Sequence, residues 1–205
     1  GGHGVGPVVD DLAFGGVTLF FVLSGYLITG RLLSGQTLRR FYANRARRLL
    51  PAMLVMLAAT GAWFLALGSS PWALVEAGTY VRNITAAHLG AGPTPWSHMW
   101  SLASEEQFYL LWPLAFGLAH RRRALVAVGC LSFAAMLTAF AVGDVPMARF
   151  SPLTQAWTLC LGCWLALRGW APSWPSWLSW APLRWFGVRS YGMYLWHFPL
   201  IAAAS

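Results

Sequence analysis

The chain has 205 residues, of which 58% are hydrophobic and only 10% are charged, whereas soluble globular domains carry about 25% charged residues. Apolar runs of about 20 residues are long enough to cross a bilayer as helices. The net charge of +8 does not indicate nucleic-acid binding, because the arginines lie in short connections between apolar runs, as in cytoplasmic loops. We therefore expect a polytopic membrane protein with membrane lipid, and no nucleic acid, as a partner.

Six apolar runs predict an all-α transmembrane helix bundle with about six spanning helices. They cover residues 17–35, 50–68, 100–119, 124–142, 154–168 and 189–205. The positive-inside bias places the arginine-rich connections in the cytoplasm, namely residues 36–49, 120–123 and 169–188. The connections 1–16, 69–99 and 143–153 would then lie on the outer side.

Three segments have unusual compositions. Segment 72–92 is partly apolar but contains charged residues, so we expect an interfacial or re-entrant helix rather than a span. Stretch 169–188 interleaves tryptophans with prolines, which favours the headgroup level and argues against a long helix there. Cys160 and Cys163 form a C-x-x-C inside an apolar run, and we expect them to be packing residues rather than a disulfide or a metal site.

Glu105 and Glu106 lie near the outer end of run 100–119. A carboxylate inside a bilayer costs a few kcal/mol or more, so it usually faces a cavity or a partner. On a helix, Glu105 shares a face with Ser101, Tyr109 and Trp112, while Glu106 points about 100° away. This face predicts the wall of a polar pocket. The alternative is that both carboxylates reach the headgroups as interfacial residues.

The histidines give a weaker signal. His3, in a Gly-rich stretch before the first run, is typical of a loop histidine when it is taken alone. His197 lies inside the last run, where an imidazole needs a partner or a cavity, and a structural role and a ligand path are both open. His98, in the outer connection, carries little information. No two histidines have a metal-ligand spacing, so we expect no metal site.

Ser24 and Gly25 lie in the middle of the first run, where small residues allow close helix packing or a kink beside a cavity. Arg45 and Arg48 follow that run and would share a helix face. They could anchor the chain at the cytoplasmic surface or bind phosphate groups.

Four motifs, in this order, resemble those of the acyltransferase 3 family of bacterial-type membrane O-acyltransferases. They are GGVTLFFVLSGYLITGRLL, FYANRARRLLPA, WSLASEEQFYLLWP and SYGMYLWHFP. The resemblance covers nearly the whole chain. It implies that residues 1–205 form an incomplete acyltransferase 3 transmembrane domain, in which the first span and part of the C-terminal region are missing.

The resemblance implies transfer of an acyl group, most often acetyl, from acyl-CoA to a hydroxyl of a cell-surface glycan or glycolipid. It implies a multi-pass protein of the inner (plasma) membrane that needs no resident cofactor. The family pattern assigns catalysis to His3 and Glu105, with His3 as general base or transient acyl carrier. The expected substrate-binding residues are Ser24, Arg45, Arg48, Trp100, Ser101, Glu106, Tyr109, Tyr194 and His197.

Two departures from the family pattern keep an alternative open. Gln155 stands where the family commonly has an arginine, and the stretch between Leu167 and Ser190 is much shorter than usual. The alternative is a non-catalytic polytopic membrane protein, either a glycan-transport subunit or a degenerate family member. A transporter would more often show repeated halves, and none is evident in the sequence.

Overall fold

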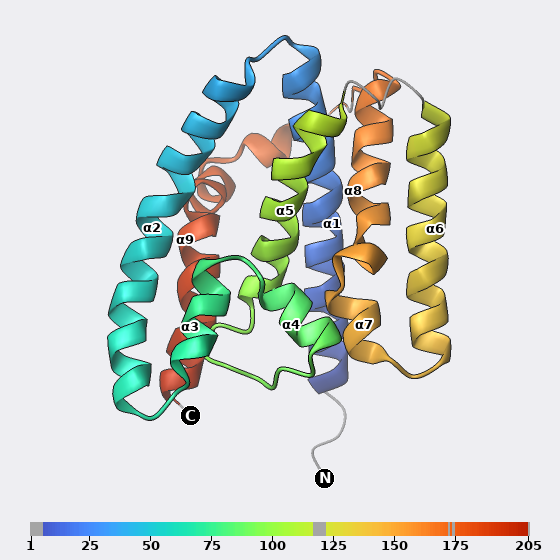
Figure 1. Ribbon diagram of the computed structural model, residues 1–205. Coiled ribbons are helices and arrows are strands. Elements are labelled where there is room, and N and C mark those ends of the chain that lie inside the picture. Colours follow the sequence, from blue (N-terminus) through green and yellow to red (C-terminus); the bar gives the residue numbers. More distant parts are fainter. Residues whose placement is uncertain (1–5, 117–121, 172, 174, 205) are drawn as a thin grey trace. The chain divides into compact units, whose positions relative to one another are not determined.

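The computed structural model (Figure 1) describes residues 6–116, 122–171, 173 and 175–204, with the side chains of 6–13 and 122 excepted. Every regular element within these ranges is a helix, which confirms the all-α prediction. Each predicted apolar run corresponds to a long helix. These helices are α1 (Gly6–Leu33), α2 (Leu38–Ala66), α5 (Met99–Ala115), α6 (Arg122–Ala141), α8 (Pro152–Leu167) and α9 (Ala181–Ala204).

Three stretches in the described part of the chain are both long and apolar enough to cross a membrane. They are Phe14–Leu33 in α1, Leu38–Ala66 in α2 and Arg123–Ala141 in α6. Helices α5 and α8 have 17 and 16 residues, fewer than the roughly 20 that a perpendicular span requires. The fold is therefore a helical membrane bundle, and the count of six crossings stays a prediction.

Two helices begin before the apolar runs that predicted them. Helix α2 begins at Leu38, so most of the predicted connection 36–49 is helical, because its arginines, leucines and alanines are strong helix formers. Helix α9 begins at Ala181, inside the stretch where the proline spacing argued against a long helix. Pro182 lies in the first turn of α9, where a helix loses no hydrogen bond to proline.

The remaining helices are short. Segment 72–92 holds two of them, α3 (Pro71–Gly78) and α4 (Arg82–His88), in place of the single predicted helix. Tyr80 lies between them with a φ of 56°, a left-handed conformation that interrupts a helix. Helix α7 (Val145–Phe150) precedes α8, and the 3₁₀ turn η1 (Ser176–Ser179) precedes α9.

The chain divides into two compact units. Unit 1 comprises the described parts of Gly1–Gln36 and Ser104–Trp170, and unit 2 comprises Thr37–Ala103 and the described parts of Ala171–Ser205. The boundary falls inside α5, whose first turns belong to unit 2 and whose remainder belongs to unit 1.

Unit 1 is organised around the close approach of α1 and α8, which run side by side with α6 next to α8 (Figure 1). A Cβ atom added at Gly25 would overlap the backbone carbonyl of Leu159, and one added at Gly162 would overlap that of Val22. The two glycines therefore let the helix backbones touch, as small residues do at membrane helix crossings. Of the two roles left open for Gly25, close packing and a kink beside a cavity, the structure shows close packing.

Serine and threonine hydroxyls add hydrogen bonds between the helices of unit 1. Ser132 on α6 donates to the carbonyl of Leu153 at 2.6 Å and accepts from the backbone N–H of Trp157 at 3.0 Å. The Gln155 amide, fully buried on α8, donates to the carbonyl of Ala148 at 2.9 Å. Such bonds satisfy polar groups that lipid cannot solvate.

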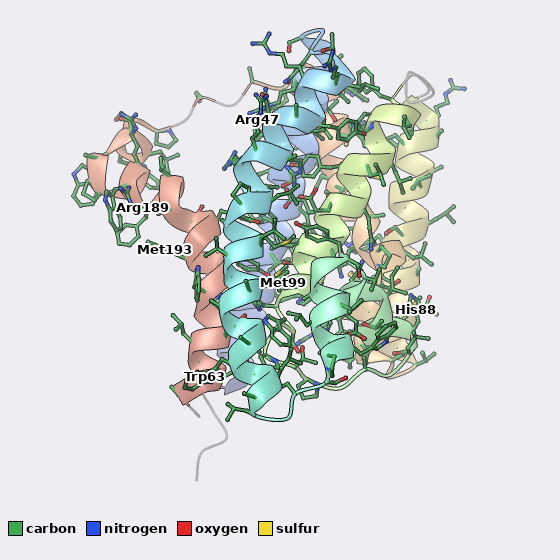
Figure 2. The ribbon with its side chains drawn as sticks, turned by 60° about the vertical axis from the view of Figure 1, so that its left-hand side comes forward. Arg47, Trp63, His88, Met99, Arg189 and Met193 are labelled. Atoms are coloured by element: carbon green, nitrogen blue, oxygen red, sulfur yellow. The ribbon has the colours of Figure 1, made fainter. Side chains whose placement is uncertain are left out.

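Unit 2 packs α2 and α9 around a core that includes Met56, Phe64, Trp96 and Leu195. The indole of Trp96 is fully buried and donates to the Thr60 hydroxyl at 2.9 Å. Figure 2 shows Arg47 on α2 and Arg189 on α9 toward one end of this unit, and Trp63 toward the other end of α2. The core thus joins the loop before α5 to both long helices of the unit.

Candidate active site

A buried hydrogen bond joins α1 and α5, the two helices of unit 1 that carry predicted site residues. Ser24 on α1 donates a hydrogen bond to Oε1 of Glu105 on α5 at 2.7 Å. Ser24 is 3% exposed and Glu105 is 4% exposed. A carboxylate in this environment must be compensated by hydrogen bonds or by its own protonation. The structure therefore confirms that Glu105 is an interior carboxylate rather than a side chain that reaches the headgroups.

The face of α5 that was predicted to be polar and aromatic is the buried one. Ser101, Glu105, Tyr109 and Trp112 are all buried. The indole of Trp112 donates to the Thr29 hydroxyl on α1 at 3.0 Å. Glu105 thus lies one turn before an aromatic stretch that is fixed to α1 by a second hydrogen bond.

Glu106 differs from Glu105, as the helical spacing predicted. Its side chain is half-buried while that of Glu105 is buried. A rotation of about 100° per residue separates the two carboxylates. The structure assigns the interior position to Glu105 alone and leaves Glu106 at the edge of the buried face.

The two arginines expected to bind phosphate lie in the first half of α2, in unit 2. Arg45 is half-buried and Arg48 is exposed. Their spacing of three residues places both on one side of the helix. Two guanidinium groups on one face suit a polyanionic ligand, which they can hold by charge-assisted hydrogen bonds.

A second polar cluster lies in unit 2, between the start of α5 and α9. The hydroxyl of Tyr194 donates to the backbone carbonyl of His98 at 2.6 Å and also contacts the Ser101 hydroxyl. Ser101 and Tyr194, both predicted to bind substrate, are therefore brought together. Trp100, also predicted, directly precedes Ser101 in the chain; it is half-buried and has contacts of its own.

His98 is the residue that the sequence analysis missed. Its side chain is 6% exposed, and its ring lies 5.1 Å from that of His197 and 5.4 Å from that of Phe198, measured between centroids. Within the described part of the chain, neither ring nitrogen has a hydrogen-bond partner. The contacts with α9 join residues about 100 positions apart, so no local pattern could have indicated them.

Burial and the neighbouring charge of His197 lower the pKa of His98 from its usual 6.5 to about 3. The backbone of Leu195 lies close by and opposes this shift, without the geometry of a hydrogen bond. Burial disfavours the charged imidazolium. His98 is therefore neutral throughout the physiological range.

His197 is exposed, and its Nδ1 lies 2.6 Å from the backbone carbonyl of Tyr194. A carbonyl can only accept a hydrogen bond, so Nδ1 carries the proton. In the neutral ring, Nε2 is then the unprotonated nitrogen. The structure thus gives His197 a definite tautomer beside the buried ring of His98.

A buried ion pair holds the loop that leads to His98. Arg82 donates to Oε2 of Glu76 at 2.8 Å, to the Ser97 hydroxyl at 3.3 Å and to the carbonyl of Gly92. Arg82 is 3% exposed. A guanidinium with several acceptors can tie distant backbone segments together. Arg82 is therefore a positioning residue for the loop between α4 and α5.

The remaining sequence predictions concern His3, the two cysteines of α8 and a metal site. His3, expected to be catalytic, lies outside the described residues. Cys160 and Cys163 are buried free cysteines on α8, which confirms that they are packing residues. In the described part of the chain, no group of three or more His, Cys, Asp and Glu residues could hold a metal ion.

The helical bundle, with membrane-length helices and a carboxylate buried beside a serine hydroxyl, defines an integral membrane protein with a polar interior. Residues 3–143 match the family model described as an acyltransferase domain. This match covers more than half of the chain, and the chain therefore belongs to this acyltransferase family. The match also includes the motifs around Ser24, Arg45 and Glu105.

The curated proteins that are similar to this chain include O-acetyltransferases. The chain is 27% identical to the peptidoglycan O-acetyltransferase OatA of Listeria monocytogenes, over 94% of this chain and 45% of the relative. It is 32% identical to the O-acetyltransferase OatA of Staphylococcus aureus, over 78% of this chain and 30% of the relative. The chain thus spans less than half the length of these relatives. No solved structure matches it significantly.

Proposed function

We propose that the full-length protein is a membrane O-acetyltransferase that moves an acetyl group from acyl-CoA to a hydroxyl of a cell-surface glycan or glycolipid. The observation that carries this proposal is the buried Ser24–Glu105 pair, inside a bundle that belongs to an acyltransferase family. The peptidoglycan named for the Listeria monocytogenes relative makes a peptidoglycan-type glycan the first acceptor to test.

The chemistry requires a base and a stabilised charge. An alcohol is a poor nucleophile until its proton is removed, and histidine is suited to that role near neutral pH. In the proposed step, His3 takes the proton of the acceptor hydroxyl. The hydroxyl oxygen then attacks the acyl carbonyl, and the donor thiolate leaves. Transient acylation of His3 is the alternative route.

Glu105 would stabilise the imidazolium that forms when His3 takes the proton. A buried carboxylate is effective in this role, because low local polarity strengthens its attraction to a nearby cation. The Ser24 hydroxyl supports this role, since its hydrogen bond fixes one carboxylate oxygen of Glu105.

Arg45 and Arg48 would hold the phosphate groups of the donor at the cytoplasmic side. We expect the protein to lie in the inner (plasma) membrane, with multiple spans and no resident cofactor. The acceptor would then reach the site from the outer side, where the α4–α5 loop and the start of α5 are predicted to lie.

Acetyl transfer can be measured with the full-length protein in liposomes. Acetyl-CoA carrying a radioactive acetyl group is supplied on the cytoplasmic side, and peptidoglycan fragments are supplied on the outer side. We expect alkali-labile acetyl esters on the glycan, and at least about 100-fold fewer of them with Glu105→Gln. Acetylation of the glycan from another acetyl donor, but not from acetyl-CoA, would overturn the donor assignment. Equal transfer by Glu105→Gln would overturn the site.

A further inference from the structure

The strongest unexplained feature outside the Ser24–Glu105 pair is the imidazole of His98. It is buried, neutral, and without a hydrogen-bond partner on either ring nitrogen among the described residues. A buried donor left unsatisfied costs about 1–3 kcal/mol. Such groups are rare in native structures, and they point to a missing ligand or water.

The surroundings of His98 resemble a binding site more than a core. Phe198 stacks on the ring at an interplanar angle of 22°, and Tyr194 and His197 meet it edge-on or tilted at centroid distances of 5.3 Å and 5.1 Å. Sites for small organic ligands combine apolar and aromatic walls with a few polar groups that converge. Here the polar groups are the two His98 ring nitrogens and the unprotonated Nε2 of the adjacent His197 ring.

The backbone that carries His98 is fixed independently of its side chain. Tyr194 donates to the carbonyl of His98, and Arg82 ties the preceding loop to Glu76, Gly92 and Ser97. The imidazole is thus held at a defined position while its own polar atoms are left unused. Rigid support of an unused polar group is typical of a preorganised ligand contact.

We propose that His98 and His197 bind a hydroxyl group of an uncharged saccharide, which is the acceptor glycan if the proposed function is correct. A neutral imidazole offers one N–H donor and one lone-pair acceptor, and a sugar hydroxyl offers the same two functions. A fully ionised anion such as sulfate offers acceptors only, so it would leave the unprotonated nitrogen of His98 without a partner. The aromatic rings would contact the apolar face of the sugar ring.

The exposed side chain of His197 marks the side from which the ligand enters. His98 is buried, and the His197 ring that lies against it is open to the surroundings, so a ligand reaches His98 when the His197 ring moves aside. Displacement of His197 costs one hydrogen bond, between its Nδ1–H and the Tyr194 carbonyl. The ligand hydroxyl would then lie between the His98 nitrogens and Nε2 of the displaced His197 ring, in contact with both residues.

The test measures binding without any acyl donor, so that its outcome is separate from that of acetyl transfer. The probe is triacetylchitotriose, an uncharged glycan, titrated into the full-length protein in lipid nanodiscs. His98→Phe keeps the aromatic stack and removes both polar atoms, and His98→Gln restores a donor and an acceptor. His88→Gln, an exposed histidine on α4 of the same unit (Figure 2), is the matched control.

We expect triacetylchitotriose to bind at least about tenfold more weakly to His98→Phe, with His98→Gln intermediate and His88→Gln unchanged. In the unmutated protein, the saccharide should slow carbethoxylation of His197 by diethyl pyrocarbonate, as followed by mass spectrometry, and should leave His88 unaffected. The second measurement needs no variant, so it still tests the proposal if His98→Phe fails to fold.

Three outcomes would overturn the proposal. They are equal saccharide affinity of folded His98→Phe, an unchanged carbethoxylation rate of His197, and equal protection by inorganic sulfate. Either of the first two would mean that His98 is satisfied by water or is a structural residue, and the third would mean that the site does not select an uncharged saccharide. Saccharide binding that depends on His98 would support the site even if acetyl transfer from acetyl-CoA were absent.

Discussion

The hydroxyl of Ser24 donates to the Glu105 carboxylate at 2.7 Å, although the two residues lie 81 positions apart in the chain. The bond joins α1 to α5 in the interior of unit 1 and gives one carboxylate oxygen a fixed orientation. A hydrogen bond to an ionised carboxylate contributes about 1.5–3 kcal/mol.

Ser24→Ala should therefore lower acetyl transfer by about tenfold to 100-fold in the full-length protein, because Glu105 keeps its charge but loses a donor. The initial rate of ester formation is the measurement. Thr18→Ala is the control. Thr18 lies on the same helix, and its hydroxyl donates to the backbone carbonyl of Phe14, one turn earlier. A rate for Ser24→Ala equal to that for Thr18→Ala would show that the bond has no role in catalysis.

His3 and Glu105 should act as one unit in the full-length enzyme. We expect His3→Ala and Glu105→Gln each to remove most turnover, and the double variant to be little slower than either single variant, because each change disables the same step. The measurement is kcat/KM for all three variants. Multiplicative losses in the double variant would place the two residues in independent roles.

Arg45→Ala should raise the KM for acyl-CoA by roughly tenfold and leave the KM for the acceptor nearly unchanged, because a guanidinium–phosphate contact contributes mainly to donor binding. Arg39→Ala is the matched control, an exposed arginine earlier on the same helix. Steady-state kinetics with each substrate varied in turn would decide the matter. A donor KM that is the same for Arg45→Ala and Arg39→Ala contradicts the assignment.

Gly25→Ala and Gly162→Ala should each destabilise the protein, because the added methyl group would overlap a backbone carbonyl of the facing helix. Overpacking of this kind costs about 1–3 kcal/mol. Gly30→Ala on α1 has open space at its Cβ, so it should be neutral or slightly stabilising. Thermal unfolding in detergent measures all three. Equal melting temperatures would mean that α1 and α8 do not approach this closely.

His98 should make stability fall with decreasing pH. The unfolded chain binds a proton at this residue below about pH 6.5, whereas the folded protein does so only near pH 3. The stabilisation is therefore complete above pH 6.5 and is lost as the pH falls from there toward 3, by at most about 1.4 kcal/mol per pH unit.

The melting temperature measured between pH 7.5 and pH 4.5 tests this expectation. The fall should be smaller in His98→Phe, which has no group to protonate, and unchanged in His88→Gln. The other titratable side chains in contact with His98 are those of His197 and Tyr194. Parallel curves for His98→Phe and the unmutated protein would show that His98 titrates normally.

The sequence by itself determined the fold class, because the bilayer leaves helices as the only way to satisfy the backbone of a long apolar run. It also separated Glu105 from Glu106, since both lie on one regular helix whose period fixes which face each side chain occupies. The small size of Gly25 left close packing and a kink as the two possible roles. These features depend on local geometry and on the surrounding solvent.

Only the tertiary structure decided which partners these residues meet. Nothing near Ser24 in the sequence indicates Glu105, and nothing near His98 indicates Tyr194 or His197, because these contacts join helices that are distant in the chain. Burial likewise depends on the other helices, so the neutral state of His98 could not be predicted from its own segment. The helical period gives the direction of a side chain, and packing between helices determines what lies there.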